Sequence, residues 1–208
     1  MVYVKWTFLA VIAVLIGAFL HYTLPQHDVV RINRAYETQV TVGDNALFWA
    51  GTAPGEGSPG AQRYVNLIET FTPEGKVIVF RNEDTGWGWP PYFKFDTSNL
   101  QAEAGDLKSS KDNPQWVVVT HYGWRNEYLS IYPNAVGIRA VDRPDVTIIP
   151  WLNILILGTL TVIAAWIWRV LARFREDRIE PLIDEAGDFI DSVDDRAENL
   201  WQRLFGRR

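Results

Sequence analysis

The chain has 208 residues, a formal net charge of −5 and no cysteine. This length allows one domain with membrane attachments, the lack of cysteine excludes disulfides and thiolate metal sites, and the negative charge disfavours a nucleic-acid partner, which needs a basic surface. The histidines, His21, His27 and His121, are too far apart in the sequence to favour a histidine metal site.

The first predicted element is a transmembrane helix within residues 1–24. Its apolar run extends from Trp6 to Leu20 and is interrupted only by Thr7. At a rise of ~1.5 Å per residue, about 20 residues cross the hydrocarbon layer of a bilayer. The alternative is a cleaved signal peptide, but no Ala-x-Ala cleavage site follows the run. We therefore expect the helix to be retained.

Residues 25–148 are predicted to form a small, mainly antiparallel β domain of sandwich or barrel type. The candidate strands are rich in β-branched and aromatic residues and are separated by turn residues such as Pro73-Glu74-Gly75 and Pro133-Asn134. These strands are Asp28–Val42, Arg63–Phe71, Lys76–Arg81, Gln115–His121, Tyr128–Tyr132 and Val136–Val141. One short helix is expected at Asn99–Lys108, because Ser98 and Gln101 match a capping box.

Two stretches of this domain match catalytic patterns, and both matches fail on context. Gly55, Gly57 and Gly60 spell G-x-G-x-x-G, but a Thr-Ala-Pro loop precedes them and a strand-like run follows, whereas a dinucleotide site needs a strand before and a helix after. Asp84-Thr85-Gly86 matches the aspartic protease triplet, but that chemistry needs two aspartates sharing a proton. We interpret Asp84 as a residue of an exposed turn.

Acidic residues near this turn offer a further site. Glu83, Asp84 and Asp96 carry oxygen ligands suited to a hard cation, but their spacing fits no known metal-binding loop. No G-x-S-x-G nucleophile motif is present either. We therefore predict no catalytic residues, no cofactor, no metal site and no enzymatic activity.

Aromatic residues are unusually dense between Trp87 and Phe95, and further aromatic residues follow at Trp116, Tyr122, Trp124, Tyr128 and Tyr132. For the strand aromatics we favour a core position, because large rings fill a small β core. Trp87 and Trp89 lie in a Gly/Pro-rich loop, and for them core and contact roles remain open, with a partner protein or the outer headgroup layer as the surface contacted. The candidates for partner binding here are Trp87, Trp89, Tyr92 and Phe93.

The second predicted transmembrane helix lies within residues 149–172. Its apolar run, Trp151–Trp168, contains only Asn153 and two threonines as polar residues. Four arginines follow, as is typical of the cytoplasmic side of a membrane: Arg169, Arg173, Arg175 and Arg178. With two spans, this pattern places both termini in the cytoplasm and the central domain on the other side.

Each predicted transmembrane helix carries a stripe of small residues. The stripes are Ala10, Ala13 and Gly17 on the first helix, and Gly158, Thr161 and Ala165 on the second. Small residues let helix backbones approach closely in lipid. Either the two helices pack on each other through these stripes, or one stripe contacts a foreign subunit.

Residues 173–208 are predicted to form a cytoplasmic amphipathic helix. Apolar residues recur in steps of three and four, as in a heptad repeat: Ile183, Ala186, Ile190, Val193, Ala197, Leu200 and Leu204. The polar face is acidic, which opposes adsorption to an anionic membrane surface. We interpret the apolar face as a contact for another helix, either its own copy or a partner subunit; the alternative is a solvated helix.

Four segments carry a resemblance to a known family: His21–Gln26, Arg81–Asp96 (RNEDTGWGWPPYFKFD), Thr120–Val136 (THYGWRNEYLSIYPNAV) and Ile149–Asn153. The chain resembles an uncharacterised bacterial inner-membrane family, a domain of unknown function with two transmembrane helices around a periplasmic domain. The resemblance implies a location in the bacterial inner membrane. It implies no reaction, cofactor or catalytic residue, and it weakens beyond Arg178.

Two functional hypotheses follow from these features. The first is a non-catalytic accessory subunit, tether or assembly factor of a larger inner-membrane complex, such as a respiratory or photosynthetic complex. Membrane helices with small residues, an aromatic outer domain and a heptad tail would each supply a contact. The second is a periplasmic ligand-binding or sensing module that signals through the membrane. The expected partners are membrane lipid and integral-membrane proteins, or a second copy bound through the C-terminal helix.

Overall fold

The computed structural model describes residues 2–41, 62–179 and 181. The chain divides into two compact units, Met1–Asn153 and Ile154–Arg208. The first unit contains one long helix and the β domain, whereas the described part of the second is the continuation of another long helix. The glycine-rich loop with Gly55, Gly57 and Gly60, and the heptad residues from Ile183 to Leu204, lie outside the described residues.

Helix α1 (Val2–Thr23) opens the first unit. Its residues are almost all apolar, and Gly17 is the one glycine in the helix, which contains no proline. The helix ends where the amide of Leu24 bonds to the carbonyl of Leu20, directly before Pro25. Its side chains are not buried in the protein, and it is long and apolar enough to cross a membrane.

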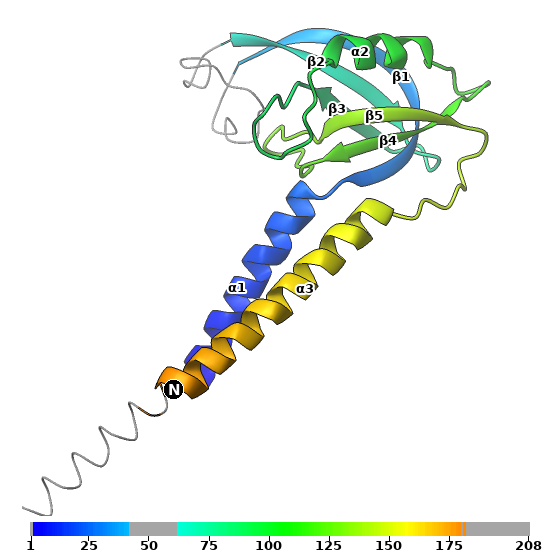
Figure 1. The fold of residues 1–208 in the computed structure, drawn as a ribbon. Coiled ribbons are helices and arrows are strands. Elements are labelled where there is room, and N and C mark those ends of the chain that lie inside the picture. The colour runs from blue at the N-terminus through cyan, green and yellow to red at the C-terminus, as the bar shows by residue number, and fades with distance from the viewer. Residues whose placement is uncertain (1, 42–61, 180, 182–208) are drawn as a thin grey trace, which may run out of the picture. The chain divides into compact units, whose positions relative to one another are not determined.

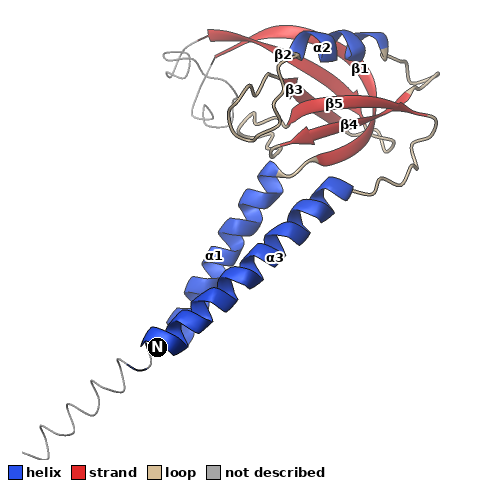
Figure 2. Ribbon diagram, in the orientation of Figure 1, coloured by secondary structure: helices blue, strands red, loops and turns tan. Residues whose placement is uncertain are grey.

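The β domain is a closed barrel of five strands with one helix (Figures 1 and 2). The strands are β1 (Gln26–Thr41), β2 (Gln62–Phe71), β3 (Val77–Asn82), β4 (Trp116–Tyr122) and β5 (Asn134–Val141). Their order around the barrel is β1-β2-β3-β5-β4, and helix α2 (Thr97–Asp106) lies between β3 and β4 in the chain. This is the topology of the OB-fold, a five-stranded Greek-key barrel.

Strand β1 closes the barrel because it pairs with two neighbours. Its first part runs antiparallel to β4, from Gln26 opposite His121 to Arg31 opposite Trp116. Its second part runs antiparallel to β2 from Arg31 onward, with a register shift between Ile32 and Arg34. The barrel interior is filled by buried aliphatic and aromatic side chains, and α2 adds two residues to it. The core comprises Val30, Ile32, Ile68, Phe80, Leu100, Ala104, Val117, Val119 and Ala135.

Strands β3 and β5 meet in the one parallel pairing, which joins only Arg81 and Asn134 among the described strands. The side chain of Asn134 completes the seam. Its Oδ1 accepts a hydrogen bond from the Glu83 amide at 2.9 Å, and its Nδ2 donates to the Glu83 carbonyl at 3.0 Å. A fully buried side-chain amide thus pairs with backbone groups that the short ladder leaves open.

Helix α2 begins earlier than the sequence predicts, and its cap is a different residue. The N-cap is Asp96, whose carboxylate accepts a hydrogen bond from the Asn99 amide at 3.1 Å. The prediction of Ser98 as the cap, with Gln101 completing a capping box, is therefore wrong. Gln101 instead accepts a hydrogen bond from the Asn82 side chain at 2.9 Å, because the first turn of the helix lies against the end of β3.

Five of the six predicted strands are present with shifted ends, but Tyr128–Tyr132 is not a strand. This segment is a turn that bonds back on itself through Asn126 and Ile131, in hydrogen bonds of 3.0 and 2.9 Å. The expected core position of the aromatic residues fails here, since Tyr128 is 99% exposed and Trp124 is 38% exposed, whereas Tyr122 is buried. Asn134 begins β5 and is not part of a turn.

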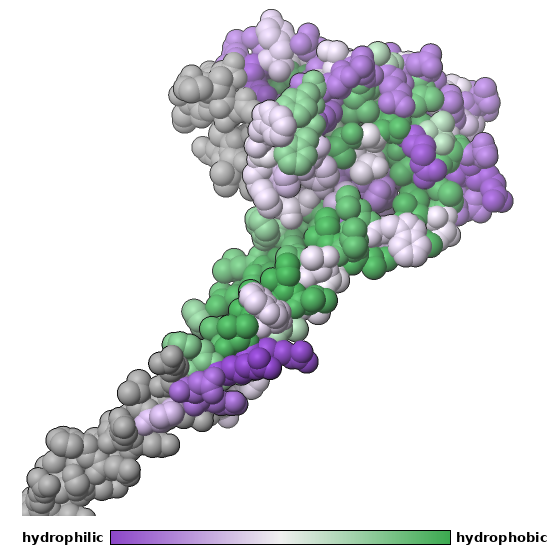
Figure 3. Space-filling view, in the orientation of Figure 1, coloured by the Kyte–Doolittle hydropathy of each residue, from purple (hydrophilic) through white to green (hydrophobic). Residues whose placement is uncertain are grey.

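Helix α3 (Trp151–Phe174) begins in the first unit and continues into the second, where a π-helical turn, η2 (Arg175–Ile179), follows it. It starts and ends two residues later than the predicted span of residues 149–172. Like α1, it is long and apolar enough to cross a membrane. Figure 3 shows apolar side chains along this helix and hydrophilic ones at its C-terminal end. The sequence-based layout of two long apolar helices flanking a small β domain is confirmed.

Candidate functional site

The last turn of α1 is bonded directly to two loops of the barrel, residues 83–96 and 123–133, and we call this contact region the junction. The Tyr92 hydroxyl donates to the carbonyl of Thr23 at 2.6 Å. The amide of Gly123 donates to the carbonyl of Tyr22 at 2.9 Å. The final carbonyls of a helix have no partner within the helix. The barrel loops satisfy two of them, so the end of α1 and the barrel form one structure.

Aromatic rings reinforce the junction. The ring of Tyr22 meets Tyr122 at a centroid distance of 6.2 Å and Trp124 at 5.3 Å, both edge to face. Tyr92 stacks on the buried Tyr122 at 4.7 Å. Trp89 stacks on Phe19, one turn back along α1, at 5.5 Å. Aromatic pairs of this kind each contribute about 0.5–1.5 kcal/mol beyond their buried area.

Gly123 is favoured at the junction by its backbone conformation. Its φ of +99° lies in the region that residues with a side chain rarely adopt. The beginning of α3 is tied to the same corner, because the Asn153 side chain donates to the Pro25 carbonyl at 2.9 Å. This contact accounts for the one amide side chain in the second apolar run.

Lys94 is buried beside the β3–β5 seam. Its ammonium group donates to the side-chain oxygen of Asn82, to the Glu83 carbonyl at 3.3 Å and to the Ala135 carbonyl at 3.0 Å. Burial lowers the pKa of Lys94 from 10.5 to about 8, although the nearby carboxylates of Asp84, Glu83 and Asp96 raise it. All three donors of the ammonium therefore hold strand ends together.

The carboxylates near this seam are each committed to a partner. Glu83 is buried and pairs with Arg63 and with Arg81, the latter at 3.2 Å. Asp84 is exposed and accepts a hydrogen bond from the Thr97 hydroxyl at 2.6 Å, and Asp96 caps α2. In the described ranges, no group of three or more His, Asp or Glu side chains is placed to hold a metal ion.

Trp87, Phe93 and Phe95 form an exposed cluster, which we call the aromatic patch. The ring of Trp87 lies 5.5 Å from Phe93 and 5.3 Å from Phe95, and the three side chains are 83%, 53% and 54% exposed. Phe93 has a φ of +50°, which is unusual for a bulky residue. Tyr92 and Lys94, on either side of Phe93, enter the protein, whereas the ring of Phe93 stays outside. Strain of this kind is often found at functional sites.

A groove of about 420 Å³ adjoins the aromatic patch. It lies between the patch, α2 and β5. Its apolar lining includes Phe93, Phe95, Leu100, Val136 and Ile138, and its rim includes Asp96 and Glu103. A second groove of about 440 Å³ lies beside the beginning of β2 and the end of β3, lined by Tyr64, Asn66, Asp84 and Thr97 among others.

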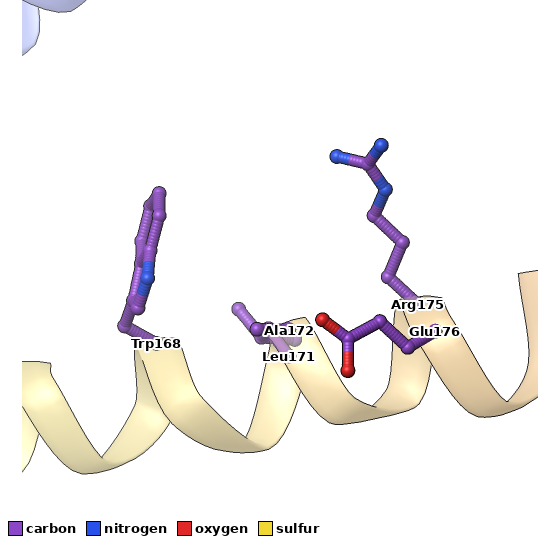
Figure 4. A pocket seen from close by; sticks show the side chains of 5 residues that line it. All are labelled: Trp168, Leu171, Ala172, Arg175 and Glu176. Carbon is purple, nitrogen blue, oxygen red and sulfur yellow. The ribbon is translucent and has the colours of Figure 1, made fainter.

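A third groove, of about 380 Å³, lies on the last turns of α3 (Figure 4). Trp168, Leu171, Ala172, Arg175 and Glu176 line it. Figure 4 shows the indole of Trp168 and the guanidinium of Arg175 standing on the same side of the helix with Ala172 between them. A tryptophan and an arginine at the end of an apolar helix are typical of anchoring at a membrane surface. We do not interpret this groove as a ligand site.

Comparison with known proteins identifies relatives but no activity. A family described as "Protein of unknown function (DUF1523)" matches residues 1–175. The chain belongs to this family. An uncharacterised protein of Haemophilus influenzae is 36% identical over 161 residues, which cover 74% of this chain and 87% of that protein. No solved structure matches the chain. The DUF1523 match includes α1, the barrel and α3, and it ends before the acidic heptad segment.

The predicted partner-binding residues of the aromatic stretch have different positions in this DUF1523 member. Trp87 and Phe93 are in the exposed patch, Trp89 lies against α1, and Tyr92 is held inside the junction. Sequence reasoning missed Lys94, Asn134 and Phe95. Phe95 had a signal in its spacing, since Phe93 and Phe95 alternate with Lys94 as strand residues do. The burial of Lys94 and Asn134 had no comparable signal, because it depends on the distant strand pairing.

Proposed function

We propose that this protein is a non-catalytic accessory subunit, tether or assembly factor of a larger inner-membrane protein complex. In this proposal α1 and α3 cross the membrane, the barrel lies in the periplasm, and a partner protein binds the aromatic patch. The observation that carries the proposal is the patch itself: three large rings clustered on the barrel surface, next to a groove, with one of them on a residue whose φ is positive.

The chemistry of the patch suits a protein partner. Tryptophan and other aromatic residues are enriched in the centres of protein interfaces, where their burial stabilises binding. Asp96 and Glu103 at the rim of the groove add negative charge beside the apolar lining. We therefore expect a partner segment that places an apolar side chain in the groove and a lysine or arginine at its rim.

The junction supports a tethering role. Because the barrel is bonded to the end of α1 without a linker, the aromatic patch keeps a fixed position relative to that helix. Such rigidity favours binding of a neighbouring subunit, because less conformational entropy is lost when the complex forms. The heptad face from Ile183 to Leu204 would provide a second contact in the cytoplasm.

The test is affinity purification of the full chain in mild detergent, with quantitative mass spectrometry. The double variant Trp87→Ala/Phe93→Asn removes two rings of the patch, and asparagine tolerates the positive φ at position 93. We expect it to accumulate normally and to lose the co-purifying partner. An unchanged set of co-purifying proteins would refute the patch as the contact.

A second candidate function, a periplasmic ligand-binding or sensing module, is favoured by the groove beside the beginning of β2 and the end of β3. Its exposed Tyr64 offers a ring for stacking, and Asn66 and Asp84 offer hydrogen bonds. The variant Tyr64→Ala separates the two functions. The sensing function would replace the tether if Tyr64→Ala abolished the cellular phenotype without reducing partner recovery. The double variant of the patch would then have to leave both the phenotype and partner recovery unchanged.

A further inference from the structure

We propose that the barrel itself contacts the lipid bilayer, by inserting Trp89 and the loop 123–133 into the outer headgroup layer. This inference rests on the membrane-spanning role of α1 in the proposed function and adds a lipid-binding surface to it. Four exposed residues form the surface, which we call the lipid collar: Trp89, Trp124, Tyr128 and Leu129.

The position of Trp89 along α1 carries the argument. Its indole stacks on Phe19, which belongs to the apolar run of α1. Phe19 is four residues before Thr23, and at ~1.5 Å per residue it lies about 6 Å below the end of the helix. A helix that crosses the membrane with its apolar run in the hydrocarbon therefore holds Trp89 at the interface, the depth that tryptophan prefers.

The loop 123–133 also starts beside the C-terminal end of α1. Its first residue, Gly123, is bonded to the carbonyl of Tyr22, and Trp124 packs against the ring of Tyr22 at 5.3 Å. The loop then returns through the Asn126–Ile131 pairing, which presents Tyr128 and Leu129 at 99% and 57% exposure. Large apolar side chains that are exposed together on a surface mark a contact with a partner or a membrane. The exposed tyrosine and leucine of this turn lie beside the end of an apolar helix, so we infer that their contact is the membrane.

The distribution of apolar side chains on the barrel agrees with this surface. Eleven large apolar residues are exposed between residues 26 and 150 of the described chain, and seven of them lie in the two junction loops. Three of the seven form the aromatic patch, and the other four form the lipid collar. The charged side chains of the loop tip, Arg125 and Glu127, pair with each other, so the tip carries no excess negative charge to oppose anionic lipid.

The lack of cysteine permits a direct test in the full chain. Single-cysteine variants are labelled with an environment-sensitive fluorophore and reconstituted into vesicles of phosphatidylethanolamine and phosphatidylglycerol. The vesicles contain lipids with a nitroxide group, which quenches the fluorophore, placed either near the headgroup or deep in the acyl chain. The collar positions are Trp89→Cys and Tyr128→Cys. Tyr128 is almost fully exposed, so its replacement leaves the fold intact.

Two controls accompany the collar positions. Ile12→Cys reports the middle of α1. Tyr64→Cys is a matched exposed tyrosine near the beginning of β2, which Figure 1 shows at the end of the barrel away from α1. We expect the collar probes to lose most of their emission to the shallow nitroxide and little to the deep one. The Ile12 probe should show the reverse, and the Tyr64 probe should be quenched by neither.

Each other outcome has a definite meaning. Collar probes that behave like the Tyr64 probe, beside a deeply quenched Ile12 probe, would overturn the lipid collar and leave the membrane span standing. Collar probes shielded from water but unquenched by lipid would indicate a protein contact and would also overturn it. An Ile12 probe that neither nitroxide quenches would refute the membrane span, and the lipid collar with it.

Discussion

Lys94 and Asn134 show how single buried polar residues complete this barrel. The parallel seam between β3 and β5 has one residue pair, and these two side chains add hydrogen bonds to it. Nothing in the local sequence distinguishes Lys94 from a surface lysine, because its acceptors come from Asn82, Glu83 and Ala135, which only the fold brings together. The sequence can place such residues on a loop or strand but cannot show that they are buried.

Replacement of Lys94 by methionine is expected to destabilise the barrel by about 1–3 kcal/mol, because it leaves buried carbonyl oxygens without a donor. Hydrogen–deuterium exchange of the full chain in detergent, followed by mass spectrometry, measures this as faster exchange in β3 and β5. Lys108→Met, on a less buried lysine after α2, serves as the control. Equal protection of the seam in wild type and Lys94→Met would contradict the structural role of the ammonium.

The same lysine predicts a pH dependence of stability. Its pKa of about 8 in the folded state lies below 10.5, so the unfolded chain holds the proton that the folded chain releases between these values. The free energy of unfolding should therefore rise as the pH increases from about 8 to 10, by on the order of 1–2 kcal/mol. Burial raises the pKa of Tyr92 and Tyr122, whose deprotonation opposes the effect only at higher pH. The rise should be absent in Lys94→Met.

At the scale of elements, alternating apolar and polar residues bounded by turn residues predict a strand well where one face of the strand packs in the barrel core and the other faces outward. They fail at residues 128–132, where β-forming residues such as Tyr128 and Ile131 occur in a turn that is fixed by hydrogen bonds across its own base. They also fail at the beginning of α2. Asp96, Ser98 and Asn99 are all capable caps, and the choice of Asp96 depends on contacts of the first turn with Asn82 and Asp84.

Two alanine variants test the cap directly. Asp96→Ala should lower the stability of α2 by about 1 kcal/mol, because the Asn99 amide loses its acceptor. Ser98→Ala should have little effect, since the helix already includes Ser98 as an interior residue. Amide exchange within Thr97–Asp106 provides the measurement. If Ser98→Ala were the more damaging of the two, the capping box predicted from the sequence would be restored.

At the scale of the whole molecule, composition and hydropathy indicate two apolar helices around a β domain, and the structure has this layout. They do not decide between a sandwich and a barrel, because that choice depends on which strands pair. The pairings of β1 with β4 and of β3 with β5 join segments far apart in the chain. The junction was also beyond prediction, although the polar Asn153 within an apolar run was a visible sign of a specific contact.

The orientation of the chain remains a prediction and can be measured with a reporter enzyme that is active only outside the cytoplasm. Fusion at Gly57, between β1 and β2, should give an active reporter, and fusion at Arg208 an inactive one. The physical reason is the arginine-rich segment that follows the second apolar run, which favours the cytoplasmic side. The opposite pattern of activity would reverse the assignment of sides.

The double pairing of β1 has a consequence for biosynthesis. The half of β1 that begins at Gln26 pairs with β4, which ends at Tyr122. At a synthesis rate of ~5–20 residues per second, β4 therefore leaves the ribosome roughly 5–20 s after this half of β1. Throughout this interval a strand edge with unpaired amides and carbonyls is open to other chains. In the finished barrel each described strand is paired on both sides. The period in which this protein is most exposed to misassembly is therefore its own synthesis, when a chaperone that covers strand edges would protect it most.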